Sequence, residues 1–340
     1  MTRAARDAIL RGIGGATDTH EAFNFREKHE DGLSSIDVFG MIEELEIPLE
    51  FKPLNELLGA CVRVSSTEVG ILVTTRRDLH MQRFTAAHEL GHFVLEHEGS
   101  LDREVRMPGD TRNRDPREIE ADAFAAEFLM PKWLVKAAAK RRNWWAETPL
   151  RTPDTVYQLS LRLAASYEAT CWGLLAHEFI EREFAESLVA KKLKDVKLAL
   201  LQGASLEDSW ADVWHLGSGD AGSELVAGPN DVFVVELEEP ASTGFRWEPR
   251  EVTAVGFGLV DDTSVFDENV VGGSSRRRIV LSAPPAGVYD FRLPLRRSFG
   301  PRPSGGSAAS TNEFRLSIST VGTRQGEGLS GGAAPPPTVH

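Results

Sequence analysis

Two spacings of hydrophobic residues divide the chain. In the first part, apolar side chains recur mostly every three or four positions, which predicts helices. The clearest of these stretches are residues 34–45, 81–98, 115–130, 159–166 and 178–201. Between the first two, short β-prone runs predict a small sheet at residues 49–51, 61–64 and 70–74. Residues 1–30 are polar and mixed, and we expect a short helix or a loose arm there.

The last third of the chain changes to separate β-prone runs. Gly, Ser and Ala are frequent between residues 216 and 229, a composition typical of linkers. Beyond this segment, strands are predicted at residues 232–235, 278–281, 288–293 and 314–318. Turn residues separate these runs, which favours an antiparallel sandwich. Residues 321–340 are rich in Gly and Pro with little to bury, so we expect a disordered tail.

These patterns predict an α+β protein with two folded parts. A mixed domain of helices and a small sheet comes first, and an all-β sandwich follows it. The predicted boundaries are an arm at 1–30, a first domain at 31–200, a linker at 201–225, a second domain at 226–320 and a tail at 321–340.

Composition narrows the function classes. The 340 residues include 38 Lys and Arg against 51 Asp and Glu, giving a net charge of -13. Because duplex binding depends on neutralising phosphates, this charge argues against a direct nucleic-acid role. Cys61 and Cys171 stand far apart, so the sequence contains no thiolate metal motif. No secretory leader or membrane-spanning run is readable, and we expect a cytoplasmic protein without a membrane partner.

The strongest chemical signal is the run His88-Glu89-Leu90-Gly91-His92 within a predicted helix. Residues four apart lie on one helix face, so both imidazoles can reach one metal ion. Zn²⁺ favours such nitrogen ligands and needs a third protein ligand beside an open position. Glu89 could then act as general base toward a water whose pKa zinc lowers to about 7. The structural alternative is a helix whose histidines are only hydrogen-bonded.

The neighbours of these histidines favour the metal interpretation. Ala86, Ala87 and Gly91 are small and would let another element approach the helix closely. The third ligand is expected downstream, on a helix that Asp115 can cap and Pro116 can begin.

The candidate third ligand on that helix is Glu118. Glu118 and Asp122 are four apart, so Glu118 could bind zinc while Asp122 orients a histidine. Glu120 is the alternative ligand if this register is wrong. Glu118 could also be a capping-box residue that never contacts metal.

Both motifs resemble the ImmA/IrrE family of metallopeptidases. The resemblance covers residues 30–200 and rests on Gln82–His92 and Glu118–Pro131. It implies a zincin-like domain and a zinc-dependent endopeptidase of the gluzincin type. It also implies that residues 155–200 form a small helical subdomain, and that the substrate is a helix-turn-helix repressor whose cleavage switches on mobile-element transfer or a stress response. The oxyanion-stabilising group stays open among His97, Tyr157 and the arginines.

The C-terminal part resembles the chagasin family of cysteine-peptidase inhibitors. That family has an immunoglobulin-like sandwich that presents three loops to papain-type enzymes. Its first loop reads Asn-Pro-Thr-Thr-Gly-aromatic-x-Trp. This chain matches it with Pro240, Thr243, Gly244, Phe245 and Trp247. It departs from it with Glu239 in place of Asn and with Ser242 inside the motif.

Two further loops carry the same resemblance. Gly272 and Gly273 fall in the second loop, and Arg297-Ser298-Phe299 stands where the family has Arg-Pro-Trp. Losing that Trp removes a large rigid anchor. For this domain alone, the structural alternative is a hairpin with Gly244 at positive φ and Trp247 in the core.

The sequence therefore supports three functions. The first is a zinc endopeptidase acting on a protein substrate, expected to be a transcriptional repressor. The second is an inhibitor or binding module for a papain-like cysteine peptidase. The third is a metal-binding regulator without proteolysis.

Overall fold

The computed structural model describes residues 2–63, 68–97, 114–145, 150–204, 206, 208–240, 244–266, 275–297 and 313–321. These residues form two compact units, the first built from 2–26 and 36–131 and the second from 27–35 and 132–320. The predicted α+β class is confirmed. Among the described helices, none has the length and apolar character that crossing a bilayer requires.

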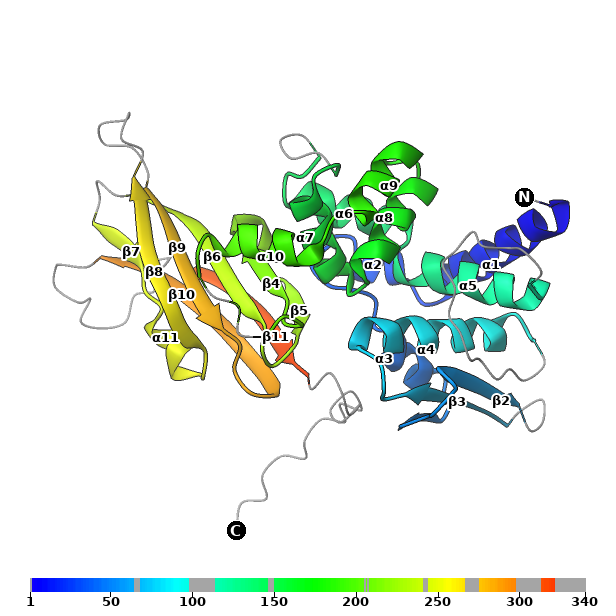
Figure 1. The fold of residues 1–340 in the computed structure, drawn as a ribbon. Coiled ribbons are helices and arrows are strands. Elements are labelled where there is room, and N and C mark those ends of the chain that lie inside the picture. Colours follow the sequence, from blue (N-terminus) through cyan, green and yellow to red (C-terminus); the bar gives the residue numbers. More distant parts are fainter. Residues whose placement is uncertain are drawn as a thin grey trace, which may run out of the picture. The chain divides into compact units, whose positions relative to one another are not determined.

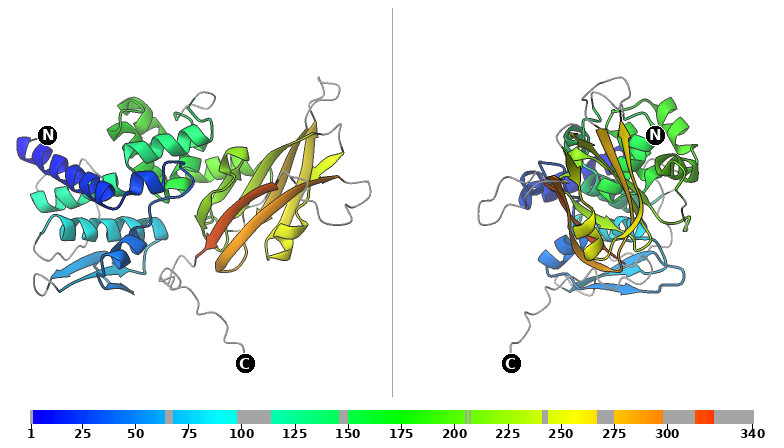
Figure 2. Two further views of the ribbon diagram at one scale, coloured as in Figure 1. Left: turned by 180° about the vertical axis from the view of Figure 1, so that it is seen from behind. Right: turned by 90° about the vertical axis from the view of Figure 1, so that its left-hand side faces the viewer.

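The first unit is layered. Its sheet has the order β1-β3-β2, with β1 (Leu49–Lys52) parallel and β2 (Gly59–Arg63) antiparallel to β3 (Val69–Thr74). Helix α4 (Leu79–Val94) packs on β2 and β3, and α5 (Pro116–Leu129) packs on α4 (Figure 1). Helix α3 (Val38–Glu44) also contacts α4. The second viewpoint in Figure 2 shows the same order of sheet, α4 and α5.

An N-terminal helix completes this unit where the sequence suggested an arm. Helix α1 (Arg3–Ala22) runs for 20 residues and packs along α5. Its buried residues are small or polar and recur at helical spacing: Ala5, Ala8, Gly12, Ala16, Thr19 and His20. A Cβ at Gly12 would lie 2.2 Å from the carbonyl oxygen of Glu120. The interface is therefore built by close backbone approach, which a search for large apolar residues does not detect.

The second unit begins with helices that pack in succession, α6 on α7, α7 on α8 and α8 on α9. Their bounds are α6 (Lys132–Arg141), α7 (Pro153–Leu163), α8 (Tyr167–Ala176), α9 (Arg182–Val189) and α10 (Leu193–Leu201). The short α2 (Phe25–Lys28) precedes α3 in the chain. The helices predicted over residues 155–200 are thus present.

Two four-stranded sheets form the rest of this unit. Their orders are β5-β11-β10-β7 and β4-β6-β9-β8. The strands are β4 (Val213–Leu216), β5 (Glu224–Ala227), β6 (Val232–Glu239), β7 (Phe245–Trp247), β8 (Gly258–Phe266), β9 (Ser275–Ser282), β10 (Gly287–Arg297) and β11 (Glu313–Thr320). A 3-10 turn, η1 (Ser218–Asp220), follows β4, and α11 (Arg250–Ala254) packs on β10. Most pairs are antiparallel, whereas β4–β6 and β5–β11 are parallel.

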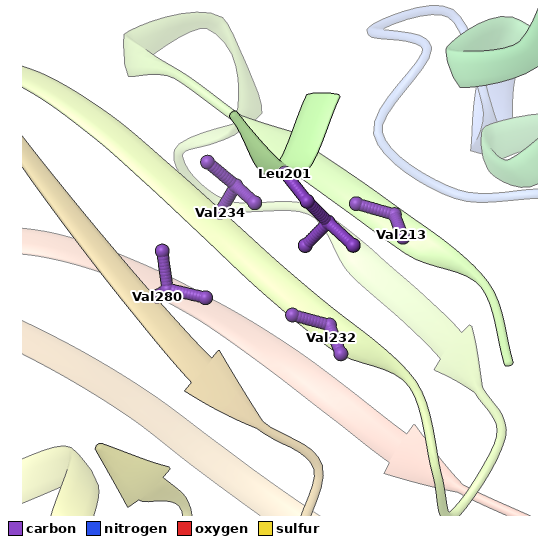
Figure 3. Close-up of a cluster of buried hydrophobic side chains, with 5 residues drawn as sticks. All are labelled: Leu201, Val213, Val232, Val234 and Val280. Atoms are coloured by element: carbon purple, nitrogen blue, oxygen red, sulfur yellow. The ribbon is translucent and has the colours of Figure 1, made fainter. Parts of the chain in front are cut away.

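Strand β6 is buried on both faces. Phe233 stacks with Trp214 and meets Phe257, which in turn contacts Phe291 of the other sheet. Val232 and Val234 instead join Leu201 at the end of α10, as Figure 3 shows. Successive side chains of a strand point to opposite faces, so the unbroken apolar run of β6 follows from having a covering layer on each side.

The segment predicted as a linker, residues 201–225, contains ordered structure. Strand β4 pairs with β6, and β5 begins at Glu224. Between these two strands, Asp220 lies buried with its Oδ1 accepting hydrogen bonds from Arg142 (2.6 Å) and Arg162 (2.9 Å). Although burial alone would raise the pKa of Asp220, the two guanidinium groups hold it well below its usual range. This paired charge connects η1 to the helices of its own unit.

Two glycines of α1 provide a test of its packing. Gly12→Ala should lower the free energy of unfolding by about 1–3 kcal/mol, because the new Cβ would collide with the α5 backbone. Gly14→Ala is the matched control, since a Cβ placed there would have no other atom within 4 Å. Alanine favours helices, so this variant should gain up to about 1 kcal/mol. Chemical denaturation measures the free energy of unfolding of both variants. If Gly12→Ala were stabilised as much as Gly14→Ala, the packing of α1 on α5 would be contradicted.

Candidate functional site

Helix α4 presents two histidines on one buried face. Asp78 caps the helix, its side chain accepting the Met81 N–H at 2.9 Å. His88 and His92 lie four positions apart and are 2% and 1% exposed. Their Nε2 atoms are 3.1 Å apart. The predicted spacing therefore directs both rings toward one point, as the helix geometry requires.

Glu118 reaches the same point from the first turn of α5. Its Oε2 lies 3.5 Å from His88 Nε2, and its Oε1 lies 3.5 Å from His92 Nε2. Asp115 caps this helix by accepting the Arg117 N–H at 3.0 Å. Among the described residues, His88, His92 and Glu118 form a group whose ligand atoms lie within 4.8 Å of one another. The Glu118 side chain is 28% exposed, the most exposed of the three.

These three side chains fit a zinc ion. Zn–N and Zn–O bonds of about 2.0–2.2 Å in tetrahedral geometry place neighbouring ligand atoms about 3.3 Å apart. The two imidazole nitrogens are 3.1 Å apart, and each lies 3.5 Å from a different oxygen of the Glu118 carboxylate, which is close to that value. Two imidazoles and one carboxylate also leave a fourth position open, which is the donor set of catalytic rather than structural zinc sites.

Asp122 lies behind His88, one turn after Glu118 on α5. Its Oδ1 is 2.8 Å from His88 Nδ1, and its other oxygen pairs with Arg114. A carboxylate at Nδ1 favours the tautomer that keeps the proton there and leaves the Nε2 lone pair for a metal. The structure thus places Asp122 at the ring nitrogen of His88 that lies away from Glu118. Arg114 is an addition that the sequence analysis did not single out.

Glu89 points toward the sheet rather than into solvent. Its side chain is completely buried, and its Oε1 would lie 2.6 Å from a Cβ placed on Gly59 at the start of β2. Thr85, one turn earlier on α4, would meet the same Cβ at 2.4 Å. Since glycine leaves this space open, Gly59 lets the carboxylate of Glu89 sit between the helix and the edge strand.

Glu120 does not join the three ligand atoms. Its Oε2 lies 3.0 Å from His97 Nε2 and 3.1 Å from Arg11 Nη1. Position 120 is two residues from Glu118, so on a helix its side chain points to a different face. Glu120 is placed to support the site from outside.

Tyr157 is one of the candidates for the oxyanion-stabilising group. Its side chain is buried in the second unit, where its hydroxyl takes part in two hydrogen bonds. Its hydroxyl donates to Asp212 Oδ1 at 2.8 Å and accepts the Val213 N–H at 2.9 Å. Burial and the adjacent Asp212 raise its pKa well above the usual value.

In the second unit, the strand ends that flank the predicted inhibitor loops are paired with one another. In the sheet registers, Glu239 pairs with Ser275, Ser275 with Phe266, and Arg297 with Phe245. The ends of β6, β8 and β10 and the starts of β7 and β9 therefore lie at one end of the sandwich. The guanidinium of Arg297 also lies 5.1 Å from the Phe245 ring centroid, a cation–π contact.

The first of these loops is anchored by a buried carboxylate. Glu239, 2% exposed, accepts the Trp247 N–H at 2.9 Å, and the Trp247 ring N–H donates to the Glu238 carbonyl at 2.9 Å. Gly244 has φ 73°, and Trp247 is 9% exposed, as the hairpin interpretation predicted. Pro240 follows the end of β6 and is the last described residue before the first loop. Thr243, Gly272, Gly273 and Phe299 lie outside the described residues.

Comparison with known proteins agrees with the first resemblance. Residues 42–174 match the family model Peptidase_M78, the IrrE N-terminal-like domain. This is a metallopeptidase family, so the predicted resemblance of this segment is confirmed. The match contains α4 and α5 with the histidines and Glu118, and it ends within α8. No curated protein matches the chain.

Among solved structures, two small proteins align with the C-terminal part. One is the cysteine protease inhibitor EhICP2 from Entamoeba histolytica, with 23% identity and a TM-score of 0.27, covering 33% of this chain and 98% of that one. The other is amebosin, with 16% identity and a TM-score of 0.25, covering 32% of this chain and 98% of that one. The first is named as an inhibitor of the class that this part was predicted to resemble.

Proposed function

We propose that this chain is a zinc-dependent endopeptidase whose active site consists of His88, His92, Glu118 and Glu89. The observation that carries the proposal is the convergence of two imidazole Nε2 atoms and one carboxylate, with separations of 3.1–3.5 Å. The match of residues 42–174 to a metallopeptidase family supports it. Zinc is the proposed ion because a set of two imidazoles and one carboxylate suits it better than Mg²⁺ or Ca²⁺, which prefer all-oxygen sites.

The proposed reaction is hydrolysis of a peptide bond. When bound, zinc would polarise the scissile carbonyl and lower the pKa of a water molecule. Glu89 takes the proton from the attacking water and then delivers it to the leaving amine nitrogen. Its burial between α4 and Gly59 restricts the carboxylate, so little conformational freedom is lost during the reaction.

The sheet suggests how a peptide could lie beside Glu89. Strand β2 is at one edge of the order β1-β3-β2, and among the described residues it pairs only with β3. An extended peptide can add to such an edge through backbone hydrogen bonds. Because β2 begins at Gly59, next to the carboxylate of Glu89, a peptide paired there would pass the active site.

The proposed protein substrate is a helix-turn-helix transcriptional repressor. This part of the proposal rests on the resemblance to the ImmA/IrrE family. A repressor encoded beside this chain is the first protein to test as a substrate.

Replacing Glu89 by Gln tests the mechanism. Glu89→Gln should retain bound zinc but lower cleavage by about 10²–10⁴-fold, the usual contribution of general acid–base catalysis. Digestion of a peptide library by the wild type and by the variant, read by mass spectrometry, measures this even while the natural substrate is unidentified. Equal cleavage by both proteins would refute the role of Glu89. Zinc binding by the wild type without any cleavage would favour the metal-binding regulator.

A second function is favoured by the turns at one end of the sandwich. We propose that this end binds a papain-like cysteine peptidase, with Phe245 and Arg297 as contact residues. The observation behind it is that the registers of β6–β9, β8–β9 and β10–β7, with the hydrogen bond from the Trp247 N–H to Glu239, bring the described residues that flank the three predicted loops to the same end.

Papain inhibition by the full chain tests this binding. Phe245→Ala should weaken inhibition at least about 10-fold, because central aromatic anchors carry much of the binding energy at interfaces. Val288→Ala is the control, since this side chain is 78% exposed and lies at the start of β10, away from those turns. Absence of inhibition at high micromolar concentration, or equal loss in both variants, would remove the second function.

A further inference from the structure

His97 is a buried neighbour of the ligand His92 and lies at its Nδ1, whereas Glu118 lies at its Nε2. The Nδ1 atoms of the two rings are 2.9 Å apart, and the ring planes are inclined by 69°. His97 is 5% exposed. Its other nitrogen, Nε2, lies 3.0 Å from Glu120 Oε2. His97 therefore connects a proposed zinc ligand to a carboxylate that is not itself a ligand.

This contact depends on where α4 ends. The sequence predicted a helix to residue 98, but α4 ends at Val94, and Glu96 has φ 57°. On a continued helix, position 97 would lie about 140° around the axis from position 92. Instead the chain turns back, and the His97 N–H donates to the carbonyl of His92 at 2.9 Å. The left-handed residue thus brings His97 against His92.

A charged pair fixes the far side of His97. Glu120 projects from α5 with its side chain 8% exposed, and it pairs with Arg11 of α1 at 3.1 Å. Arg11 lies outside the family-matched residues 42–174. Helix α1 therefore adds the last member of a chain of contacts, Arg11–Glu120–His97–His92.

The order of donors and acceptors along this chain determines which nitrogen of His92 is free for a metal. Glu120, as a carboxylate, can only accept, so the Nε2 of His97 carries a proton. In a neutral imidazole the Nδ1 of His97 then has a lone pair, which accepts the Nδ1–H of His92. The proton of His92 is thereby held on Nδ1, and its Nε2 lone pair faces His88 and Glu118.

We propose that His97 is a positioning residue that, through Glu120, selects the metal-binding tautomer of His92 and so sets the affinity of the site for zinc. This inference rests on the proposed zinc site and assigns to this chain a support that comes from the turn after α4 and from Glu120 of α5. Asp122 supports His88 in the corresponding way, so each histidine ligand has its own acceptor at the end of its chain.

Zinc affinity measured by competition with a chromogenic chelator tests the proposal. His97→Leu and Glu120→Met should each raise the dissociation constant for zinc about 10–100-fold, because both remove the acceptor chain behind a ligand. Glu120→Gln should stay within about 3-fold of the wild type, since its amide oxygen still accepts from His97. Arg11→Ala should also have a small effect, because its side chain is 60% exposed. Co²⁺ loading of the same proteins should shift the visible absorption bands in His97→Leu.

Two controls separate positioning from general damage. His80→Leu changes another histidine of α4, in its first turn, and should leave zinc affinity unchanged. Arg3→Ala removes an arginine of α1 that pairs with Asp7 in solvent, and should match the wild type. Circular dichroism of the metal-free proteins identifies any variant that fails to fold. If His97→Leu does not fold, the difference in zinc affinity between Glu120→Met and Glu120→Gln tests the proposal instead.

The outcomes distinguish this inference from the zinc proposal itself. Wild-type affinity in folded His97→Leu, or equal losses in Glu120→Met and Glu120→Gln, would overturn the role of His97 while leaving the zinc site in place. A wild-type protein that binds no zinc would overturn both.

Discussion

The close packing of α5 against α4 is the contact on which the candidate metal site depends. A Cβ at Gly91 would lie 3.0 Å from the Phe124 ring, closer than ordinary van der Waals contact, so glycine favours the close approach of the two helices. Gly91 is adjacent to His92, and Phe124 lies six residues after Glu118. A larger side chain at position 91 would require the Phe124 side chain to shift on α5, the helix that also carries Glu118. The position of Glu118 thus depends on the contact between Gly91 and Phe124, neither of which is a proposed ligand.

Glycines also allow close packing in the two outer layers of the first unit, the sheet and α1. Gly59 brings the edge strand against Glu89, and Gly12 brings α1 against the backbone of Glu120. Close approach at three glycines leaves the charged side chains between the layers with little room to move. Those side chains then pair with one another, so that Glu120 and Asp122 each have a cationic or imidazole neighbour. Paired charges of this kind tolerate burial that a single charge would not.

The sequence predicted the parts of this arrangement that follow from helical spacing. His88, His92, Glu118 and Asp122 are separated by one turn within their helices, and the small residues Ala86, Ala87 and Gly91 predicted the close helix that the structure contains. The support behind them was not predictable in this way. The interface of α1 uses Ala and Gly instead of large apolar residues, and His97 reaches His92 only because Glu96 adopts a left-handed conformation that non-glycine residues rarely show. Strands β4 and β5 were predicted as linker because residues 216–229 are rich in Gly, Ser and Ala and each strand is only four residues long. The partner of β5, strand β11, also lies far away in the sequence.

The proposal that one zinc ion is held by His88, His92 and Glu118 is tested most directly by a crystal structure of the zinc-loaded protein with anomalous data at the zinc edge. We expect one strong peak about 2.0–2.2 Å from His88 Nε2, His92 Nε2 and an oxygen of Glu118. A peak bound instead through Glu120, or one away from the two histidines, would show that the proposed ligand set is wrong.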